Sequence, residues 1–528
     1  MSRYDVIVIG SGIGGLTAAL TCAKAGRSVL VLEAAKQFGG FCNPFARKDF
    51  WFDTGIHYIG EMGEGQSLRR QFERLEIYDA IGFRELNPDG FDRYVFPDYE
   101  VRMGKGAERF RDTLVRDFPH EREGIDKFFR LLAEMEQVIR LASKIKGPKS
   151  LLKLVPHAQL LWKYRNANFS EMLDGCVKDY RLRAALAGPG GDIGLPPGKA
   201  SGLMMLGLLA HFLGGAYFPK GGTKAVRDAY VTALKENGAD LRRNAPVEKI
   251  LTDSDRVTGV RTAKGEEFLA DVVISNADAA FTLGTLLGRD QLGGRLKRKI
   301  DSTTQSLGSL CAFIGTDLQL DTLGIDDANI WSYPSYDIDA LYQPALDGVL
   351  GTELPFFLTS PTLKDPGGTH APAGKHTVEL ITFAAFEPFK KWSNEKVMKR
   401  DPEYKELKER LGMALVERAE QFIPNLSSHM EVREFSTPLT NVSFANVPQG
   451  AIYGPEHSPE QFGLGRYRTQ GPVEGLLLCG SSVMGAGIGT CVASGTMAGK
   501  MALRAPKQSR LSMPRALRQR ITKTFAKA

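Results

Sequence analysis

The first 32 residues place two short apolar runs around a glycine-rich turn and a helical pattern. Residues 4–9, YDVIVI, form a β-branched run of the kind that buried parallel strands show. The stretch from Leu16 to Ala25 predicts a helix that Gly26 closes, and Ser28 to Leu32 predicts a second strand. This succession of strand, helix and strand indicates an α/β fold.

Similar elements recur in two later parts of the chain. Residues 214–278 predict a helix that ends at Asn237-Gly238, followed by a strand, a hairpin and another strand. Leu476 to Cys479 predicts a strand, which a glycine-rich loop and a helix follow. Between these parts the pattern predicts helices over residues 121–143 and 405–422, and a strand over residues 307–314.

One apolar stretch is long enough to raise the question of a membrane-spanning helix. Residues 201–218 carry no Lys, Arg, Asp or Glu, and their number is close to the minimum for a span. His211 and four glycines interrupt the stretch, and Pro219-Lys220-Gly221-Gly222 ends it with a turn. We therefore expect a buried helix that runs into a strand, and no transmembrane segment.

The composition of the 528 residues is that of an ordinary globular protein, and the length predicts several domains or one domain with an insertion. The net charge of +7 is concentrated at the C-terminus, where the last 24 residues hold seven Lys and Arg and no acid. The rest of the chain holds 61 basic and 61 acidic side chains, so a nucleic-acid-binding groove is not expected there.

The six cysteines lie far apart, without a CxxC motif or a Cys/His cluster of zinc spacing. We therefore expect reduced thiols, as in a cytoplasmic protein, and no metal site. The first predicted strand begins at residue 4, so no signal or transit peptide is expected before the fold.

The turn after the first predicted strand is GSGIGG, a GxGxxG motif formed by Gly10, Gly12, Gly14 and Gly15. Gly10 permits a tight turn, Gly12 lets a pyrophosphate approach the backbone, and Gly15 lets the helix and the strand pack closely. Free N–H groups at the helix start face the phosphates. Glu33, at the end of the second predicted strand, can accept hydrogen bonds from ribose hydroxyls. We therefore expect a dinucleotide site here, and we do not expect NADP to be its ligand.

Three further segments decide between the possible dinucleotides. The first is Gly39-Gly40, which allows another close backbone approach, together with FDTGIHY at residues 52–58. The second is APVEKIL within residues 214–278, and the third is the glycine-rich run at residues 475–499. Together these segments resemble the FAD-dependent amine oxidase and phytoene desaturase superfamily, over essentially the whole chain up to about residue 504. The resemblance implies FAD as the cofactor.

The resemblance also assigns residues to the cofactor. It implies that the backbone of Val247 holds the adenine. It places four residues against the ribityl chain and the pyrimidine end of the flavin: Gly480, Ser481, Gly489 and Thr490. Many relatives carry Gly-Asp where this chain has Gly480-Ser481, so that contact is either made by a hydroxyl or absent.

The fold implied by the resemblance is α/β, with a Rossmann-type, three-layer ββα domain for FAD and a discontinuous α+β substrate domain. Residues 1–75, 214–290 and 435–504 are expected to form the FAD-binding domain. Residues 76–213 and 291–434 are expected to form the substrate or lid domain, and residues 505–528 a basic amphipathic tail.

Two segments indicate a branch of this superfamily. FDTGIHYIG at residues 52–60 and the run at residues 437–458 look like the retinol saturase and carotenoid isomerase branch, whose members act on conjugated polyenes. Saturation, desaturation and isomerisation all remain open, and the first segment favours a saturase. A saturase needs an acid near the flavin. The candidates are His57, Tyr58 and Tyr453, although His57 could serve only to bond a backbone carbonyl and the tyrosines only to line a cavity.

Two rival functions also remain open at this point. One is an amine oxidase of the same fold, and the other is a non-catalytic flavoprotein that binds a lipid. A lipid substrate would come from a bilayer, and residues 140–165 and 505–528 are basic and amphipathic, as interfacial segments are. We therefore expect a cytoplasmic protein that contacts a membrane surface. The substrate, the electron partner and the oligomeric state are left open.

Overall fold

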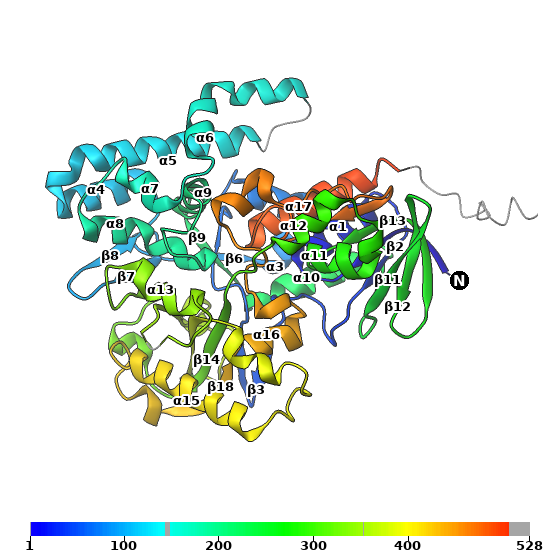
Figure 1. Cartoon of the computed structure of the whole chain (residues 1–528). Coiled ribbons are helices and arrows are strands. Elements are labelled where there is room, and N and C mark those ends of the chain that lie inside the picture. Colours follow the sequence, from blue (N-terminus) through cyan, green and yellow to red (C-terminus); the bar gives the residue numbers. More distant parts are fainter. Residues whose placement is uncertain (1, 143–147, 352, 506–528) are drawn as a thin grey trace, which may run out of the picture.

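The computed structural model describes residues 2–142, 148–351 and 353–505, which form two large sheets with helices around them (Figure 1). The first sheet has seven strands in the order β10-β2-β1-β13-β12-β11, with β19 also paired to β13. Strands β10, β2, β1, β13 and β19 run parallel, whereas β11 and β12 form an antiparallel hairpin beside them. The strands are β1 (Ser2–Ile9), β2 (Val29–Leu32), β10 (Asp240–Arg242), β11 (Val247–Asp253), β12 (Arg256–Thr262), β13 (Glu267–Ser275) and β19 (Leu476–Leu478). The α/β prediction is confirmed.

Helices α1 (Ile13–Lys24), α10 (Gly222–Glu236) and α17 (Ile488–Ala502) cover this sheet. The contact between α1 and α17 is close because small residues face each other across it. A Cβ atom on Gly495 would lie 2.2 Å from the carbonyl oxygen of Gly14, and one on Gly499 would lie 2.8 Å from the Thr21 side chain. Helices α1 and α17 therefore pack as one layer, although they lie near opposite ends of the described chain.

Helix α1 begins three residues earlier than the pattern predicts. The amide of Leu16 already donates to the carbonyl of Gly12, at 3.0 Å, so the glycine loop itself forms the first helical turn. Glycines carry no hydrophobic signal, and periodicity alone therefore places the helix start too late. This early start brings the open N-terminal amides of α1 directly to the end of β1.

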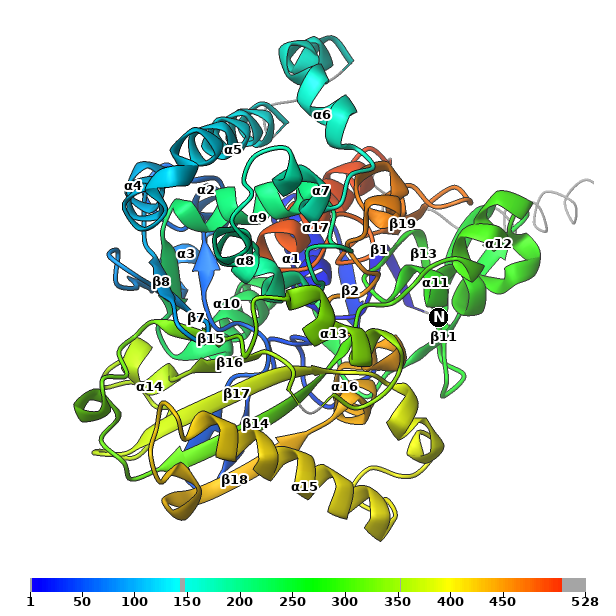
Figure 2. The same ribbon diagram turned by 60° about the vertical axis from the view of Figure 1, so that its left-hand side comes forward.

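The second sheet is mainly antiparallel, in the order β18-β14-β17-β16-β15-β7-β8. All nine residues of β14 are buried, because α15 packs near it on one side and the rest of the molecule covers the other. Figure 2 shows α15 lying across β14, β17 and β18. The elements are β7 (Asp92–Val95), β8 (Glu100–Met103), β14 (Gly308–Thr316), β15 (Asn329–Ser332), β16 (Phe356–Thr359), β17 (His376–Ala384), β18 (Met430–Ser436) and α15 (Pro402–Ala419).

A group of helices in the middle of the first half of the chain packs on the other side of the cavity described below. Its members are α4 (Ala107–Asp117), α5 (Arg122–Ala142), α6 (Ala158–Tyr164), α7 (Phe169–Asp174), α8 (Tyr180–Ala187) and α9 (Gly202–Leu213). Residues 201–218 form α9 followed by β9 (Ala216–Pro219), as predicted. In the part of the chain that the structure describes, no helix is long and apolar enough to cross a membrane.

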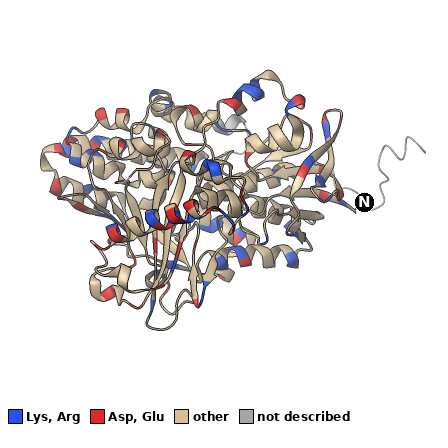
Figure 3. Cartoon of the chain, turned by 60° about the horizontal axis from the view of Figure 1, so that its bottom comes forward, with Lys and Arg blue, Asp and Glu red and all other residues tan. Residues whose placement is uncertain are grey.

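Short elements join these parts. Strands β5 (Ile59–Gly60) and β6 (Phe83–Glu85) pair with the two sides of β9, and β3 (Phe45–Arg47) pairs with β4 (Phe50–Phe52). The remaining α-helices are α2 (Ser67–Leu75), α3 (Tyr78–Ile81), α11 (Ala279–Phe281), α12 (Gly294–Asp301), α13 (Ile338–Leu346), α14 (Pro361–Lys364) and α16 (Pro438–Ala445). Basic and acidic residues are mixed over the face that Figure 3 shows.

Candidate active site

One cavity of about 2320 Å³ connects the glycine loop of the first sheet with the apolar interior between the second sheet and helices α5 and α9. Ligand pockets commonly measure about 300–1,000 Å³, so this cavity has room for a dinucleotide and a second ligand. Every candidate residue of the sequence analysis lines it except Gly15. Those that do are His57, Tyr58, Tyr453, Gly10, Gly12, Gly14, Glu33, Gly39, Gly40, Val247, Gly480, Ser481, Gly489 and Thr490.

The glycine loop is closed to side chains on its inner face. Gly10 has φ +85°, and a Cβ atom on Gly12 or Gly14 would lie 2.7 or 2.5 Å from the Asn276 side chain. A Cβ atom on Gly15 would lie 2.2 Å from the carbonyl oxygen of Gly10. Helix α1 has no side-chain cap, so its first amides stay available to an anion.

Glu33 follows β2 and is only 8% exposed, with its carboxylate fixed by three donors. Its Oε2 accepts from the amide and the hydroxyl of Ser11, at 2.8 and 2.5 Å, and its Oε1 accepts from the amide of Ala35, at 2.8 Å. A carboxylate has about four lone-pair sites, so one stays available for a ligand hydroxyl. Ser11 is a site residue that the sequence analysis missed. Its only signal there is a polar side chain inside the glycine motif.

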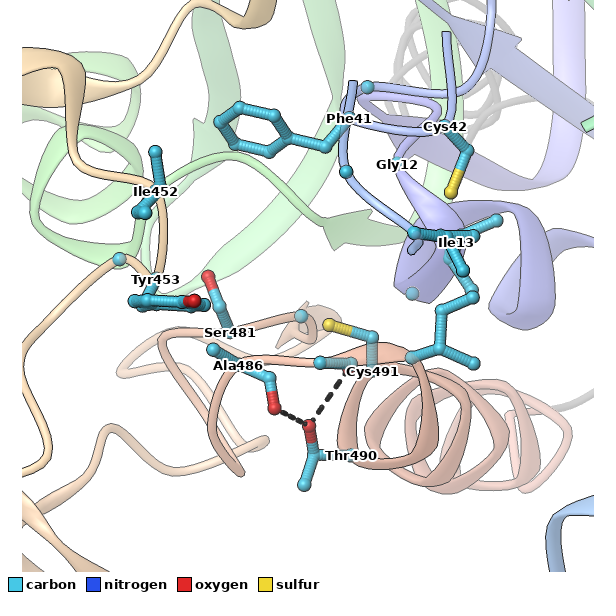
Figure 4. A pocket seen from close by; sticks show the side chains of 18 of the residues that line it. Gly12, Ile13, Phe41, Cys42, Ile452, Tyr453, Ser481, Ala486, Thr490 and Cys491 are labelled. Atoms are coloured by element: carbon cyan, nitrogen blue, oxygen red, sulfur yellow. Dashed lines mark hydrogen bonds between the residues drawn. The ribbon is translucent and has the colours of Figure 1, made fainter. Parts of the chain in front are cut away.

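The other end of the cofactor region is formed by the loop after β19 and the first turn of α17. Gly480 has φ +87°, and α17 also starts without a side-chain cap. Figure 4 shows Ser481 between Tyr453 and this turn. The Thr490 hydroxyl donates to the carbonyl of Ala486, at 2.5 Å, so it holds the loop in place. A negatively charged ring edge would be stabilised at this helix N-terminus.

These features fit FAD. Two uncapped helix starts, a fixed carboxylate and a series of glycines lie along one cavity, which is the donor and acceptor set of a phosphate-bearing dinucleotide. The glycine loop and α1 would hold the diphosphate, and Glu33 a ribose. Val247, which lines the cavity from the start of β11, would hold the adenine end. Ser481 and α17 would face the flavin.

His57 lies in the loop before β5 and is held by an acid from the second sheet. Its Nδ1 is 3.0 Å from Oε2 of Glu379, a fully buried residue of β17. Burial raises the pKa of Glu379, and its Oε1 accepts from the amide of Asp53, at 2.7 Å. The sequence analysis missed Glu379, although a single acid inside the apolar strand HTVELITFA is a detectable signal.

Asp53 has a partner of its own. Its Oδ1 accepts from the amide of Thr223, at 2.9 Å, and its Oδ2 lies 3.3 Å from Nε2 of buried His370. Burial opposes the charged forms of both groups, yet the pair lowers the pKa of Asp53 and raises that of His370. Asp53 therefore joins the loop before His57 to the start of α10 through Thr223, and to the segment before β17 through His370.

Tyr58 points into a buried carboxyl cluster. Its hydroxyl lies 2.6 Å from Oδ2 of Asp192 and 3.1 Å from Oδ2 of Asp92. Its ring stacks on Phe212 of α9, with centroids 4.3 Å apart. Burial raises the pKa of Asp92 to about 6 and that of Asp192 well above its ordinary value. Burial also raises the pKa of Tyr58, so this tyrosine stays neutral.

A buried lysine completes the cluster. Lys364, at the end of α14, donates from Nζ to the carbonyl oxygen of His57, at 2.7 Å, and to Oδ1 of Asn329. Asn329 in turn donates from Nδ2 to Oδ1 of Asp92, at 2.8 Å. Burial lowers the pKa of Lys364 to about 8. The lysine thus connects the backbone of the His57 loop to the carboxyl cluster.

The third predicted acid, Tyr453, is bound differently. Its hydroxyl donates to the carbonyl oxygen of Gly191, at 3.1 Å, and its ring lies on the side of the cavity opposite Gly12 (Figure 4). Aromatic side chains from the second sheet form the wall beside it. They are Trp331, Phe357 and Phe383. The structure therefore brings His57, Tyr58 and Tyr453 to one apolar part of the cavity.

Comparison with known proteins identifies relatives over most of the chain. The chain is 30% identical over 503 residues to all-trans-retinol 13,14-reductase of Danio rerio. This alignment covers 91% of this chain and 82% of that protein. It is also 28% identical over 519 residues to prolycopene isomerase 1 of an Oncidium hybrid. That alignment covers 94% of this chain and 83% of the isomerase.

A solved structure shows the same fold at much lower sequence similarity. Cyclohexylamine oxidase of Brevibacterium oxydans superposes with a TM-score of 0.60 at 15% identity, over 95% of this chain and 99% of that one. The profile of the flavin containing amine oxidoreductases matches residues 13–502. The chain therefore belongs to the flavin containing amine oxidoreductase family and is an FAD-dependent oxidoreductase.

Proposed function

We propose that this enzyme acts on a C=C or CH–CH bond of a polyene isoprenoid lipid, in the manner of a retinol saturase. The observation that carries the proposal is the continuity of the cavity, which joins the cofactor region to a large apolar chamber. A dinucleotide needs only the cofactor region, which is the first part of this cavity. The apolar walls of the second part suit an extended hydrocarbon.

FAD, when bound, supplies or accepts a hydride at its flavin ring. The residues of the chain have other tasks in this reaction. The aromatic wall of Trp331, Phe357 and Phe383 would hold the polyene and exclude water. His57, Tyr58 and Tyr453 face the part of the cavity where such a substrate would meet the cofactor region. We propose these three as the side chains nearest to the reacting carbons.

A carotenoid isomerase or desaturase is the second candidate, which the Oncidium relative favours. Both candidates use the same cavity and cofactor, and they differ in the redox state of the flavin at the start and in the fate of the substrate hydrogens. The direction of hydrogen transfer therefore separates them.

The division of the chain is part of the proposal. Residues 1–75, 214–290 and 435–504 would form the FAD-binding domain, because the strands of the first sheet all come from these ranges. Residues 76–213 and 291–434 would form the substrate domain, which supplies the second sheet and helices α4–α9 except for the last residues of β18.

We also propose a membrane-facing surface formed by α6 and the segment before it, residues 148–165. Leu152, Val155 and Trp162 are 69%, 62% and 70% exposed, and Arg165 lies 3.7 Å above the Trp162 ring. Figures 1 and 2 both show α6 at the periphery of the molecule, where Leu160 and Tyr164 pack inward into the hydrophobic core. Apolar residues among basic ones are typical of an interfacial segment. The other predicted membrane segment, residues 505–528, lies outside the described residues from 506 onward.

We place this surface near an end of the cavity, because the segment Pro148–His157 contacts α5. Met135, Ile139 and Arg140 of α5 line the cavity, and α5 leads in sequence toward residues 148–165. A lipid leaving a bilayer at α6 would therefore have a short path into the apolar chamber.

The test of the function is a mass measurement. The purified, FAD-loaded protein is incubated without oxygen, with its flavin oxidised in one sample and chemically reduced in another, and with free FAD as the control. Retinol and a C40 carotene are offered on liposomes. A gain of two hydrogens with reduced flavin supports a saturase, a loss with oxidised flavin a desaturase, and an isomer of unchanged mass an isomerase. No change in any sample contradicts the proposal.

The membrane surface is tested by liposome co-sedimentation. Replacing Leu152, Val155 and Trp162 with Ser is expected to weaken binding at least about tenfold, since each exposed apolar side chain that enters the bilayer contributes about 1.5–3 kcal/mol. Leu323→Ser, at an exposed apolar position of the 3-10 turn Leu320–Leu323, is the matched control. Deletion of residues 505–528 tests the tail. Equal binding of the triple variant and the control would contradict this surface.

A further inference from the structure

The cluster behind Tyr58 holds two carboxyls and one ammonium group in a buried space. Asp92 is fully buried at the start of β7, and Asp192, in the 3-10 segment Gly188–Ile193, opens onto the cavity. Lys364 is 1% exposed. The nearby acids Glu379 and Asp53 have their own partners, His57 and His370. A buried net charge is costly, so we expect the cluster to be neutral. With one ammonium group and two carboxyls, it is neutral only when one carboxyl keeps a proton.

The hydrogen bonds show which carboxyl keeps the proton. Asp92 accepts from Asn329 at Oδ1, at 2.8 Å, and from the Tyr94 hydroxyl at Oδ2, at 3.2 Å. In the described part of the chain Asp192 has one donor, the Tyr58 hydroxyl at 2.6 Å from Oδ2. Donors stabilise a carboxylate, so Asp92 is the ionised member and Asp192 the protonated one. Burial raises the pKa of Asp192 well above its ordinary value, which agrees with a protonated Asp192.

We propose that Asp192 is the acid that delivers a proton to the polyene, on the carbon next to the one that receives the hydride. This inference rests on the proposed saturase function. Asp192 is adjacent in sequence to Gly191, whose carbonyl oxygen binds the Tyr453 hydroxyl, and it is bonded to Tyr58. It therefore sits among the side chains proposed to surround the reacting carbons. Its Oδ1 has no hydrogen bond among the described residues and can carry the proton.

The step balances in atoms and electrons. One alkene carbon gains a hydride, and the reduced cofactor loses these two electrons. The π electron pair of the alkene forms a new C–H bond with the proton of Asp192, and the electron pair of the broken O–H bond stays on the carboxylate. The Tyr58 hydroxyl, which donates to Oδ2, stabilises the new anion. A two-electron donor must then reduce the cofactor again for turnover.

The other titratable groups around Asp192 are less suited to this task. They are Tyr58, Asp92, Tyr94, Tyr333, Tyr342, Lys364 and Tyr453. Burial raises the pKa of every tyrosine in this set, so each holds its proton more tightly than a free phenol. Lys364 does not line the cavity, and it directs its protons to His57 and Asn329. Asp192 is thus the carboxyl of the cluster that both faces the cavity and keeps a proton.

The first test detects the proton on Asp192 directly and needs no substrate. Infrared spectra of the FAD-loaded protein are recorded in H₂O and D₂O for the wild type, Asp192→Asn and Asp179→Asn. Asp179 is the matched control, because it caps α8 outside the cavity and Asn is an equally good cap. A protonated-carboxyl band that shifts in D₂O is expected in the wild type and the control, and its loss is expected in Asp192→Asn. A band that persists in Asp192→Asn would overturn the proposal.

The second test measures one turnover of pre-reduced enzyme with retinol on liposomes. Asp192→Asn is expected to slow oxidation of the flavin by about 10²–10⁴-fold. Asp192→Glu, which keeps the acid, is expected to recover part of the rate, and Asp179→Asn to match the wild type. If the wild type converts the polyene and Asp192→Asn does so equally fast, this inference fails while the proposed function stands. If the wild type converts no polyene, both fail.

Discussion

The two ends of the cavity are built by opposite means. At the cofactor end, backbone geometry forms the site, because Gly10 has a positive φ and Gly12 and Gly14 leave no room for a Cβ atom beside Asn276. At the apolar end, side chains from distant parts of the chain meet, and Asp192 and Lys364 reach the 57–58 segment from positions 134 and 307 residues away. The first end depends on sterics within a loop, and the second on the neutralisation of buried charge.

This difference teaches how each end should respond to substitution. A glycine loop that packs against neighbouring main chain tolerates no added Cβ atom, because that main chain cannot move aside. A buried charge cluster tolerates changes of shape better than the loss of one charge, because the remaining charges then lack compensation. The following predictions test that contrast, from the largest expected effect to the smallest.

Gly15→Ala should have the largest effect. The new Cβ atom would lie 2.2 Å from the carbonyl oxygen of Gly10, so the loop must open, and we expect loss of most bound FAD and a clearly lower melting temperature. Flavin absorbance of the purified protein and thermal unfolding measure both. Gly293→Ala, which would meet no atom within 4 Å, is the control. Full FAD content in Gly15→Ala would contradict the steric argument.

Lys364→Met removes the ammonium group from the charge cluster. We expect a loss of about 3–5 kcal/mol in the free energy of unfolding, because Asp92 stays buried without its counter-charge and the His57 carbonyl loses a donor. Denaturant unfolding at pH 7 measures it. Lys220→Met, at an exposed lysine, should change stability by less than about 0.5 kcal/mol. Similar stabilities of the two variants would show that the cluster needs no cation.

The cluster should also give stability a defined dependence on pH. Burial raises the pKa of Asp92 from 3.8 to about 6, so the folded state binds more protons than the unfolded state between these values. Stability of the wild type relative to the variant Asp92→Asn should therefore rise as pH falls from about 6 to 4, by roughly 2 kcal/mol. Lys364, with a pKa of about 8, stays protonated throughout this range. If the free energies of unfolding of the two proteins changed with pH in the same way, the raised pKa of Asp92 would be contradicted.

Ser11→Ala should have the smallest effect. It removes a hydroxyl that donates to Glu33 and accepts from the amide of Gly39, but it leaves the backbone loop intact. A lost hydrogen bond to a charged group costs about 1.5–3 kcal/mol, so we expect FAD to bind roughly 10- to 100-fold more weakly. Fluorescence titration of the FAD-free protein measures it, with Ser302→Ala as the control. Unchanged affinity would show that the backbone alone positions Glu33.

Much of the fold was predictable because its signals are local. The apolar run of β1, the glycine loop and the acid after β2 lie within 33 residues, and the 201–218 stretch has its turn at Pro219 beside it. Helix α1 was predicted too short because glycines hide its first turn. Glu379 and Asp192 were missed because an isolated acid has no periodicity, and its environment depends on strands and loops far away in the chain.

The amino-acid sequence by itself determined that this protein has a strand–glycine loop–helix unit for a dinucleotide, since the conformational freedom of glycine and the helix N-terminus are properties of neighbouring residues. The tertiary structure alone decided that Tyr58 meets two aspartates, that Lys364 balances the charge of Asp92, and that the cofactor region opens into an apolar chamber. The physical reason is burial. Whether a carboxyl keeps its proton depends on which distant side chains surround it and exclude water.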